Sequence, residues 1–500
     1  NYLELKDQLQ KLGHRMRSRT DSEVIAHLIE MHVKQGLPLD EAVRRTLLLL
    51  KGSYAIAAIF ASDEDTIICA RMESPLVIGL SPNFVCCSSD IPALPKEVEK
   101  IIVVENGEIV VIRPHTIIIK SLETGQELPL KVTLREEMTG DADIGGFTHY
   151  MLKEIHEQPQ VALNVIKAPA KFVTQLAEKL VKAERVYLIG CGTSYHACIF
   201  GSHVLRFLAK IDSFPLIASE FDYCNASLDA KTVVLALSQS GETMDVLSAL
   251  KRLQDLGIEV LALTNVMGSS ITRLASAYLG LYAGPEIGVA ATKTFTAQLL
   301  MLARVAVEAS NIKGENVDYA KRIEEFLRQS PSAIKSSISS NVRRAQELSV
   351  KMSLKDHAFF LARGVNVATA LEGALKLKEV SYVHAEGYPA GESKHGPIAL
   401  VEEDYPCVFI CPQDETYDKV IGNIMEMKAR GAFIVSCIEE GDKEVKEISD
   451  FSFVLPSVEV KMLTPVLHVL PLQLLAYYTA VARGFDPDKP RNLAKSVTVP

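Results

Sequence analysis

Two kinds of hydrophobic pattern alternate over the first 130 residues. Helical spacing of apolar positions covers the opening LELKDQLQKLG and then residues 21–35 and 39–51. Short runs rich in β-branched residues follow, namely SYAIAAIF, TIICAR, LVIGL, FVCCSS, KIIVV and EIVVI. The dipeptide Asn106-Gly107 separates the last two runs and is typical of a hairpin turn, so we expect those two strands to pair. The pattern predicts a layered α+β domain with antiparallel sheets.

From about residue 180 the pattern changes to apolar strand, glycine turn, helix and strand, which is typical of a doubly wound parallel sheet. This pattern occurs twice, at offsets of 172, 173 and 174 residues, when Gly192, Glu242 and Gly257 are matched to Gly364, Glu415 and Gly431. The sequence therefore predicts an internal repeat of two α/β units.

These patterns divide the chain into six parts. We expect the α+β domain at 1–130, a linker at 131–170, the first α/β copy at 171–315, connecting helices at 316–351, the second copy at 352–485 and a polar tail at 486–500.

Composition and charge narrow the class of protein. The 500 residues are 48% hydrophobic and 23% charged, which is typical of globular proteins. The net charge of −9 provides no overall field that favours nucleic acid or an anionic membrane, so no such partner is expected. The nine cysteines are an odd number scattered through apolar runs, which indicates reduced thiols in a cytoplasmic protein. No CxxC pair or HExxH motif occurs, and we expect no metal site.

Residues 462–482 form an uncharged stretch of membrane-spanning length. Pro465, His468, Pro471 and Gln473 lie inside it and argue against a span. We expect instead a helix buried in a large core or in a subunit interface.

Two loops of the first copy carry the residues of an anion site. Ser238-Gln239-Ser240-Gly241-Glu242-Thr243 follows one predicted strand, and Gly190-Cys191-Gly192-Thr193-Ser194 follows another. Hydroxyls, backbone N–H groups and permissive glycines at helix N-termini bind phosphate, and loops at the carboxyl ends of parallel strands share one crevice. Ordinary helix capping explains either loop taken alone. Together they favour the phosphate of a small substrate, because neither loop has a nucleotide-binding motif.

The second copy has Cys411-Pro412-Gln413-Asp414 at the position that corresponds to the loop Ser238–Thr243 of the first copy. Proline removes a donor and aspartate repels an anion, so we expect this copy to have lost phosphate binding.

Candidate catalytic groups of the second copy lie in LEGALKLKEVSYVHAEGYPAGESKHGP. Glu372, Lys376 and Glu379 share one helix face by their spacing, and a surface ladder of ion pairs is the alternative to a buried site. Apolar neighbours and the following Gly- and Pro-rich loop with His395 favour an active site. Lys495 adds an amine on a terminal segment, although terminal lysines are usually solvated.

Several motifs together resemble one family. SQSGET, EIGVAATKTFT, LEGALKLKE, GESKHGP, PRNLAKSVTV, TDSEVIAHL and HYMLKEIHEQP are similar to those of the glutamine–fructose-6-phosphate aminotransferases (isomerising), and the similarity spans the whole chain. The resemblance implies two tandem doubly wound sugar isomerase (SIS) subdomains preceded by an α+β glutaminase domain of the N-terminal-nucleophile type. It also implies conversion of fructose 6-phosphate and glutamine to glucosamine 6-phosphate and glutamate, without a cofactor, at the start of the hexosamine pathway.

The resemblance assigns roles to individual residues. It implies that the sugar phosphate is held by Thr193, Ser194, Ser238, Gln239, Ser240 and Thr243, with backbone groups of Val289 and Ala494 lining the pocket. Lys495 is expected to form an imine with the sugar, Glu379 to move a proton between C1 and C2, His395 to assist ring opening and Lys376 to support the charge. In related enzymes the histidine comes from the neighbouring subunit, which implies a homodimer.

The same comparison leaves the glutaminase site incomplete in this sequence. The family's nucleophilic cysteine and most of its glutamine-binding segments precede the position that matches Asn1, and Asp21 matches the aspartate that holds the amino group of glutamine. We therefore expect the chain as given to retain sugar-phosphate isomerisation alone. Two alternatives stay open, an SIS-domain deglycase or isomerase for another phosphosugar and a non-catalytic phosphosugar sensor.

Overall fold

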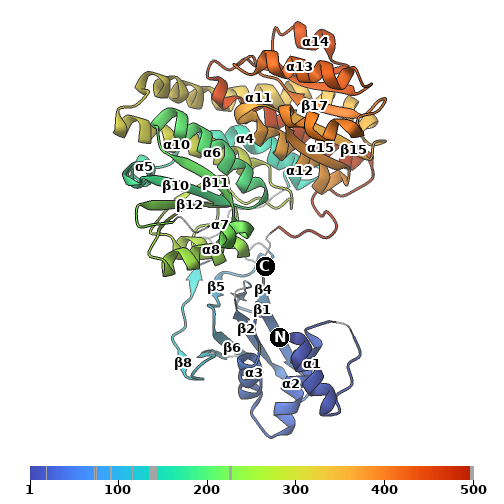
Figure 1. Ribbon diagram of the computed structural model, residues 1–500. Coiled ribbons are helices and arrows are strands. Elements are labelled where there is room, and N and C mark those ends of the chain that lie inside the picture. The colour runs from blue at the N-terminus through green and yellow to red at the C-terminus, as the bar shows by residue number, and fades with distance from the viewer. Residues whose placement is uncertain are drawn as a thin grey trace. The chain divides into compact units, whose positions relative to one another are not determined.

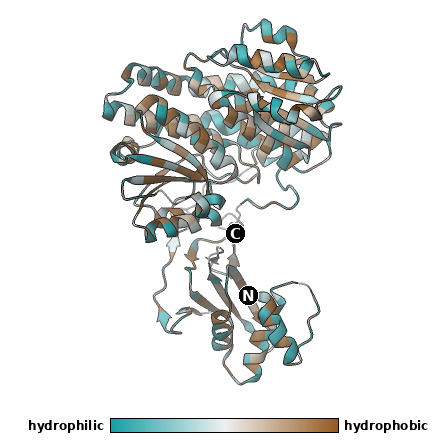
Figure 2. Cartoon of the chain, viewed as in Figure 1, coloured by the Kyte–Doolittle hydropathy of each residue, from teal (hydrophilic) through white to brown (hydrophobic). Residues whose placement is uncertain are grey.

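A computed structural model describes residues 1–500 except 19, 73, 75, 90–92, 115, 135–143, 225–227 and 496–500. The described residues fall into two compact units, one within Asn1–Gly140 and one within Asp141–Val497 (Figure 1). In Figure 2 helices of both units carry hydrophobic and hydrophilic residues side by side, as amphipathic helices do.

The first unit combines three helices with two antiparallel sheets. The helices are α1 (Tyr2–Lys11), α2 (Glu23–Lys34) and α3 (Leu39–Leu48). One sheet has the order β1-β2-β6-β7-β8 and is built from β1 (Tyr54–Phe60), β2 (Asp63–Met72), β6 (Glu108–Arg113), β7 (Thr116–Ser121) and β8 (Glu127–Leu128). The other has the order β4-β3-β5-β9 and is built from β3 (Val77–Leu80), β4 (Val85–Ser88), β5 (Lys100–Val103) and β9 (Thr133–Leu134).

Alternate residues of β2 show how these layers pack. Ile68 belongs to a buried cluster with Val43 and Leu47 of α3, whereas Cys69 belongs to a cluster with Ile78 and Ile102 of the second sheet. Successive side chains of a strand point to opposite faces, so the first sheet lies between the helices and the second sheet. The predicted layered α+β architecture is confirmed.

The predicted hairpin at Asn106-Gly107 is wrong. Gly107 does make a turn with φ of +77°, but β5 pairs with β3 and β6 pairs with β2 and β7. The turn carries the chain from one stacked sheet to the other. Its dipeptide specifies a positive-φ turn and not the partner of either strand.

The second unit contains two parallel sheets of identical topology. The first has the order β11-β10-β12-β13-β14, from β10 (Arg185–Gly190), β11 (Ser213–Ile217), β12 (Thr232–Ser238), β13 (Glu259–Thr264) and β14 (Ala277–Gly280). The second has the order β16-β15-β17-β18-β19, from β15 (His357–Ala362), β16 (His384–Pro389), β17 (Pro406–Ile410), β18 (Phe433–Glu439) and β19 (Phe451–Leu455). Each follows the 2-1-3-4-5 order of a doubly wound sheet, as the repeat predicts.

Helices cover these sheets and join the two copies. The α-helices are α4 (Tyr150–Lys167), α5 (Ala170–Lys182), α6 (Gly192–Ala209), α7 (Phe221–Cys224), α8 (Met244–Asp255), α9 (Ser270–Leu274), α10 (Lys293–Lys313), α11 (Val317–Met352), α12 (Val367–Ser381), α13 (Tyr417–Lys428), α14 (Glu444–Ile448) and α15 (Thr464–Ala482). Short 3₁₀ helices are η2 (Ala218–Glu220), η3 (Gly364–Asn366), η4 (Ala390–His395), η5 (Pro397–Leu400) and η6 (Lys461–Leu463).

Two connecting regions differ from their expected form. The 18-residue helix α4 lies within 131–170, which the sequence analysis treated as a linker, and its buried residues belong to the core of the second unit. The region 316–351 is almost entirely one 36-residue helix, α11, which continues through Pro331.

The apolar stretch near the C-terminus is a core helix. Within the described part of the chain, Lys461–Ala482 is the one helical segment long and apolar enough to cross a membrane, and 83% of its most apolar window is buried. Helix α15 packs against α11 and α12. One of its buried polar side chains, Gln473, is bound to α4, since Gln158 donates to its side-chain oxygen at 2.7 Å. These contacts agree with the prediction of a buried helix.

Candidate active site

The two predicted anion-binding loops lie at the carboxyl ends of adjacent strands. β10 and β12 pair in parallel, α6 begins two residues after β10, and α8 begins at Met244 after the loop that follows β12. The hydroxyl oxygens of Ser238 and Thr243 lie 3.0 Å apart, and Ser238 Oγ accepts the N–H of Gly241 at 3.0 Å. The hydroxyls therefore gather where a helix N-terminus offers N–H groups to an anion.

Gly241 fixes the shape of the second loop. Its φ is +67°, and a Cβ at this position would lie 2.1 Å from Ser269 Oγ. Its carbonyl accepts the N–H of Ile271 at 3.0 Å, and the carbonyl of Gln239 accepts the N–H of Asn265 at 3.1 Å. The segment from Asn265 to Ile271 therefore supports the loop that contains Gly241. Because this segment lies so close, position 241 requires glycine.

Thr193 joins the first-copy loop to the second copy. Its hydroxyl donates to Glu372 Oε1 at 3.0 Å and lies 3.1 Å from Lys376 Nζ, which donates to it. The neighbouring Ser194 accepts a hydrogen bond from the side chain of Gln298 on α10 at 2.9 Å. The start of α6 is therefore held by side chains from α10 and α12.

The charged residues of α12 form a buried cluster. Lys376 Nζ lies 3.4 Å from Glu372 Oε1 and 2.6 Å from Glu379 Oε2, and Glu372 is fully buried. His196 of α6 contacts the other oxygen of Glu372 at 2.7 Å. With 1% of its side chain exposed, Lys376 is not part of a surface ladder, so that alternative is excluded.

Opposing effects act on the Lys376 ammonium. Burial lowers its pKa, but the charges of Glu372 and Glu379 outweigh burial and hold the pKa above its ordinary value. The more distant charge of Glu286 acts in the same direction. Lys376 is therefore a fixed cation at neutral pH and cannot act as the free amine of this site.

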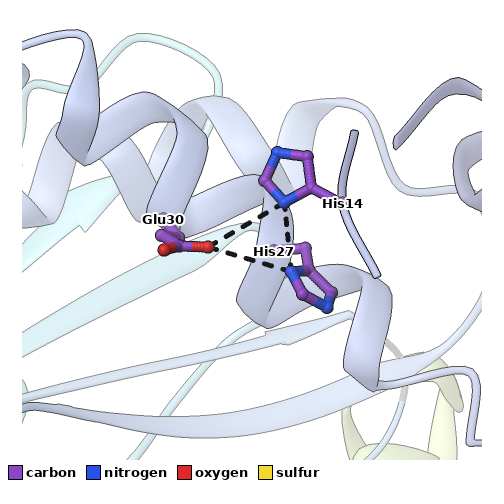
Figure 3. Close-up of side chains that lie close together, drawn as sticks. All are labelled: His14, His27 and Glu30. Atoms are coloured by element: carbon purple, nitrogen blue, oxygen red, sulfur yellow. Dashed lines mark hydrogen bonds and ion pairs between the residues drawn. The ribbon is translucent and has the colours of Figure 1, made fainter. Parts of the chain in front are cut away.

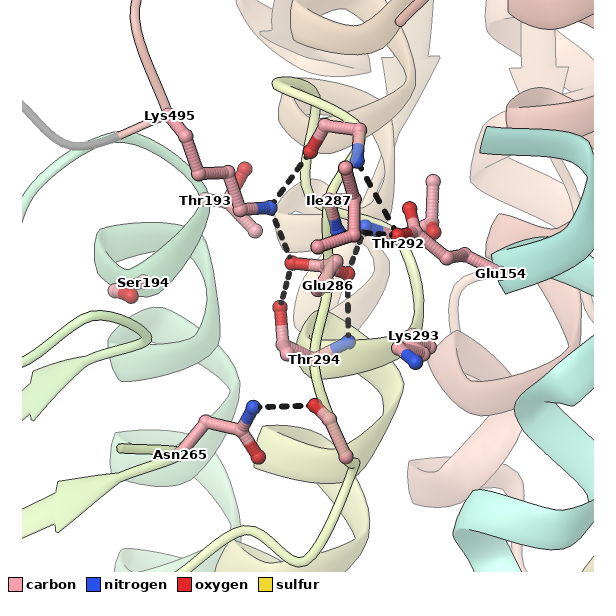
Figure 4. Close-up of polar contacts among 12 residues, drawn as sticks. Glu154, Thr193, Ser194, Asn265, Glu286, Ile287, Thr292, Lys293, Thr294 and Lys495 are labelled. Atoms are coloured by element: carbon pink, nitrogen blue, oxygen red, sulfur yellow. Dashed lines mark hydrogen bonds and ion pairs between the residues drawn. The ribbon is translucent and has the colours of Figure 1, made fainter. Parts of the chain in front are cut away.

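Lys495 is held by the segment that precedes α10. Its Nζ donates to Glu286 Oε2 at 2.7 Å and to the carbonyl of Gly288 at 2.8 Å (Figure 4). Glu286 is fully buried and also accepts hydrogen bonds from the N–H groups of Thr292 and Thr294 and from the Thr294 hydroxyl. Burial raises the Glu286 pKa, but Lys495 and these donors lower it to about 2. The predicted imine-forming lysine is thus not solvated but paired with a buried carboxylate.

A second buried carboxylate, Glu154 of α4, supports the same segment. It accepts the N–H of Ile287 at 2.5 Å and that of Gly288 at 3.2 Å (Figure 4). Burial and the nearby charge of Glu286 raise its pKa to about 8, although Lys495 opposes the shift. Neither carboxylate was predicted as a site residue from the sequence. Glu286 lay in the motif EIGVAATKTFT without a role, and Glu154 lay in a presumed linker.

The tail is anchored by Asp488. Its carboxylate accepts the N–H groups of Tyr150 and Met151 at 2.7 and 2.8 Å, in the first turn of α4. Its backbone carbonyl accepts the N–H of Val289 at 3.3 Å. Val289 is therefore adjacent to the tail, while Ala494 is exposed one residue before Lys495.

Two predicted site residues stand apart from these contacts. His395 is exposed at the end of η4, and its side chain makes no hydrogen bond or ion pair among the described residues. Asp21 is exposed in the first unit, where its carboxylate accepts the N–H of Ser22 at 2.7 Å.

In the second copy a carboxylate occupies the position of the cradle. Asp414 accepts the backbone N–H of Thr416 at 2.8 Å and its hydroxyl at 2.7 Å, just before α13. The N–H and hydroxyl of Thr416, which corresponds to Thr243 of the first copy, are therefore already bound to a carboxylate. This arrangement supports the predicted loss of phosphate binding in the second copy.

Family models match most of the chain. The SIS domain model matches residues 179–308 and 351–483, one match on each α/β copy, and the glutamine amidotransferase domain model matches residues 1–96. An enzyme of Thermococcus kodakarensis named glutamine–fructose-6-phosphate aminotransferase [isomerizing] is 43% identical, with 100% of this chain and 83% of that protein covered. The chain belongs to the glutamine–fructose-6-phosphate aminotransferase (isomerizing) family.

Further members and solved structures agree with this placement. The aminotransferase of the same name from Aquifex aeolicus is 41% identical over 100% of this chain and 82% of its own length. The C-terminal domain of glucosamine-fructose-6-phosphate aminotransferase from Francisella tularensis superposes with a TM-score of 0.65 at 36% identity, over 70% of this chain and 100% of that domain. Glucosamine-6-phosphate deaminase from Thermotoga maritima superposes with a TM-score of 0.56 at 25% identity, over 70% of this chain and 99% of that one.

Proposed function

We propose that this protein serves the conversion of fructose 6-phosphate and glutamine to glucosamine 6-phosphate and glutamate in the cytoplasm, and that the 500-residue chain carries out the sugar-phosphate part of this reaction. The observation that carries the proposal is the pairing of Lys495 with the buried Glu286, in a unit that also holds a cradle of hydroxyls and a buried Glu-Lys-Glu cluster. An amine, a carboxylate and a phosphate site are the groups that a phosphorylated ketose requires for imine formation and proton transfer.

The sugar phosphate is assigned to the loops of the first copy. The groups assigned to the phosphate lie at or near the N-termini of α6 and α8. They are the hydroxyls of Thr193, Ser194, Ser238, Ser240 and Thr243 and the side chain of Gln239. Backbone groups of Val289 and Ala494 line the sugar on the side of the tail. Binding through helix N-termini fixes the sugar while leaving its C1–C2 end for chemistry.

Lys495 and Glu379 carry the chemical steps in this proposal. The neutral amine of Lys495 attacks the C2 carbonyl and water leaves, so that an imine forms. Ammonia, or water in its absence, then replaces Lys495 at C2 and frees its amine, which leaves an open-chain imine or ketone. Glu379 removes a proton from C1 and a proton returns to C2, which gives glucosamine 6-phosphate or glucose 6-phosphate, respectively. Lys376, fixed as a cation beside Glu379, stabilises the negative charge that passes from Glu379 to the sugar when the proton is removed.

His395 and a partner subunit complete the sugar site in this proposal. Ring opening needs an acid-base group, and His395 has the residue type but lies exposed, without contact to the cluster, in the single chain. We place it in the active site of a second copy, which makes the enzyme a homodimer. Asp21, in the region matched by the amidotransferase model, is assigned to the amino group of glutamine.

A direct test follows fructose 6-phosphate by NMR with the 500-residue chain, alone and with ammonium or glutamine. We expect isomerisation to glucose 6-phosphate and exchange of a C1 proton with solvent. Lys495→Arg should abolish both, whereas Lys489→Arg, an exposed lysine of the same tail, should change neither. Equal activity of Lys495→Arg and the unaltered chain contradicts the proposal.

Mixing two inactive variants tests the shared site. Lys495→Ala and His395→Ala are each expected to be inactive, because each lacks one required group. In randomly mixed dimers, one site in about four regains both groups, so about a quarter of the original activity should return. No recovery after subunit exchange contradicts donation of His395 across an interface.

The deaminase of Thermotoga maritima supports a second candidate function, because its fold matches both α/β copies. The amidotransferase match over residues 1–96 favours the synthetic direction. Release of ammonia from glucosamine 6-phosphate faster than its formation from fructose 6-phosphate and ammonium would favour the deaminase.

A further inference from the structure

Three potential metal ligands of the first unit lie together outside the proposed sugar site. Nδ1 of His14 and Nδ1 of His27 are 3.1 Å apart, and Glu30 Oε2 lies 3.9 Å from the first and 3.8 Å from the second (Figure 3). Within the described residues, this is the group of three His, Cys, Asp or Glu side chains that meets the spacing of a metal site. We propose that His14, His27 and Glu30 bind a divalent transition-metal ion, with Zn²⁺ as the best fit.

The distances suit this ion. Tetrahedral zinc with bonds of 2.0–2.1 Å separates its ligand atoms by about 3.3 Å. The two imidazole nitrogens are already near that separation, and the exposed Glu30 side chain needs a small movement. Two imidazoles and one carboxylate are the ligand set of an open zinc site, in which water takes the fourth position.

Neighbouring groups orient the ligands. Nε2 of His27 faces Glu23 Oε1 at 3.6 Å, and Glu23 is itself fixed by the N–H groups of Arg17 and Ser18 at 2.6 and 2.8 Å. A carboxylate behind one ring nitrogen favours the tautomer that leaves the other nitrogen free to bind metal. Lys34 holds the second oxygen of Glu30 at 2.6 Å, so Oε2 is left toward the histidines.

The site is open to solvent and joins separate segments. His14, His27 and Glu30 line a concavity of about 790 Å³, and their side chains are 15%, 20% and 48% exposed. His14 follows α1, whereas His27 and Glu30 lie one turn apart on α2. A metal at this place therefore fastens the segment between the two helices. Arg15 and Arg17 line the same concavity, so the net charge of the bound site is positive and disfavours additional cations.

This cluster was not predictable from the sequence, because the ligand positions 14, 27 and 30 match no common spacing. The alternative is a hydrogen bond between the two imidazoles without metal. Cobalt distinguishes the two, because tetrahedral Co²⁺ absorbs in the visible range and histidine ligands lack the near-ultraviolet charge-transfer bands of thiolates.

The experiment is a Co²⁺ titration of the chelator-treated 500-residue chain. We expect one equivalent with visible bands and without thiolate bands. His27→Asn and Glu30→Gln should weaken binding at least about tenfold, and Glu23→Gln about tenfold to a hundredfold. His384→Asn is the control, since His384 is exposed beside Glu386 at 3.2 Å and lies outside the cluster; it should bind like the unaltered chain.

Binding that survives Glu30→Gln and His14→Asn, or that shows thiolate bands, overturns the proposal. Because Glu30 is half exposed, Glu30→Gln should fold even in the case that His27→Asn does not. A second measurement uses trypsin, which cleaves after Arg15 and Arg17. Zn²⁺ should slow that cleavage in the unaltered chain and leave it unchanged in Glu30→Gln; equal protection of both contradicts a site at this place.

Discussion

Lys495 donates a 2.7 Å hydrogen bond to Glu286, a residue 209 positions earlier in the chain. Glu286 is buried, whereas 18% of the Lys495 side chain remains exposed. The amine therefore reaches the site from a tail and is fixed there by a carboxylate of the core. A reactive amine must lose its proton, so the proposed imine chemistry requires that substrate binding separates Lys495 from Glu286.

Glu286→Gln tests this pairing. Glutamine keeps the size and can still accept the N–H groups of Thr292 and Thr294, but it cannot hold the Lys495 cation. We expect isomerisation of fructose 6-phosphate to fall at least about tenfold, with less Lys495 trapped by borohydride as the reduced imine. Full activity and full trapping in this variant contradict a holding role for Glu286.

Lys376→Met tests whether the α12 cluster is a buried charge system. It leaves Glu372 and Glu379 without their cation, and we expect a loss of about 3–5 kcal/mol in the free energy of unfolding. Lys179→Met breaks the partly exposed pair with Glu259 and should cost at most about 1 kcal/mol. Denaturant unfolding of both variants measures the difference, and equal losses are incompatible with the buried cluster.

Gly241→Ala tests the shape of the phosphate cradle. The new methyl group meets Ser269 Oγ, so the loop must move, and we expect binding of fructose 6-phosphate to weaken at least about tenfold. Gly257→Ala is the matched control, because Gly257 has a similar φ of +71° and open space around its Cβ position. It should lose about 1 kcal/mol of stability and keep its affinity. Calorimetric titration distinguishes these results.

Glu154→Gln tests the raised pKa of that carboxyl. Its folded-state pKa of about 8 lies above the ordinary value of 4.5, so between these pH values the folded protein keeps a proton that the unfolded chain has lost. This contribution to stability is complete below pH 4.5 and is lost as the pH rises through 8.

Glutamine is neutral at every pH and can still accept the N–H groups of Ile287 and Gly288. The stability of Glu154→Gln relative to the unaltered chain should therefore rise by at least about 1 kcal/mol between pH 5 and pH 9. Urea unfolding across this range provides the measurement. A difference that does not change with pH means that Glu154 is ionised throughout.

The repeat and its parallel sheets were predictable because each strand-turn-helix unit carries a local signal. Gly192 and Gly364, with φ of +51° and +58°, mark the same turn of each copy. The pairing of β5 and β6 was predicted wrongly because a turn dipeptide does not encode which sheet a strand joins. Helix α4 was missed because Pro159 and several polar residues interrupt its apolar pattern.

The site was predictable where its residues lie close in sequence. Glu372, Lys376 and Glu379 share a helix face by spacing alone, and the hydroxyls of 238–243 lie in one loop. The partners of Lys495 and Thr193 were not predictable, because they are set by contacts over 209 and 179 residues. Such contacts depend on how two copies pack, which no local pattern records.

The hydroxyl of Thr193 lies at the start of α6 in the first copy, and the charges that it contacts, Glu372 and Lys376, lie on the second. Neither copy holds both the anion cradle and the buried charges. A single-copy ancestor could have assembled this arrangement only by pairing two chains. In a chain that carries two copies, one copy can provide the hydroxyl loop while the other places Asp414 at the matching position.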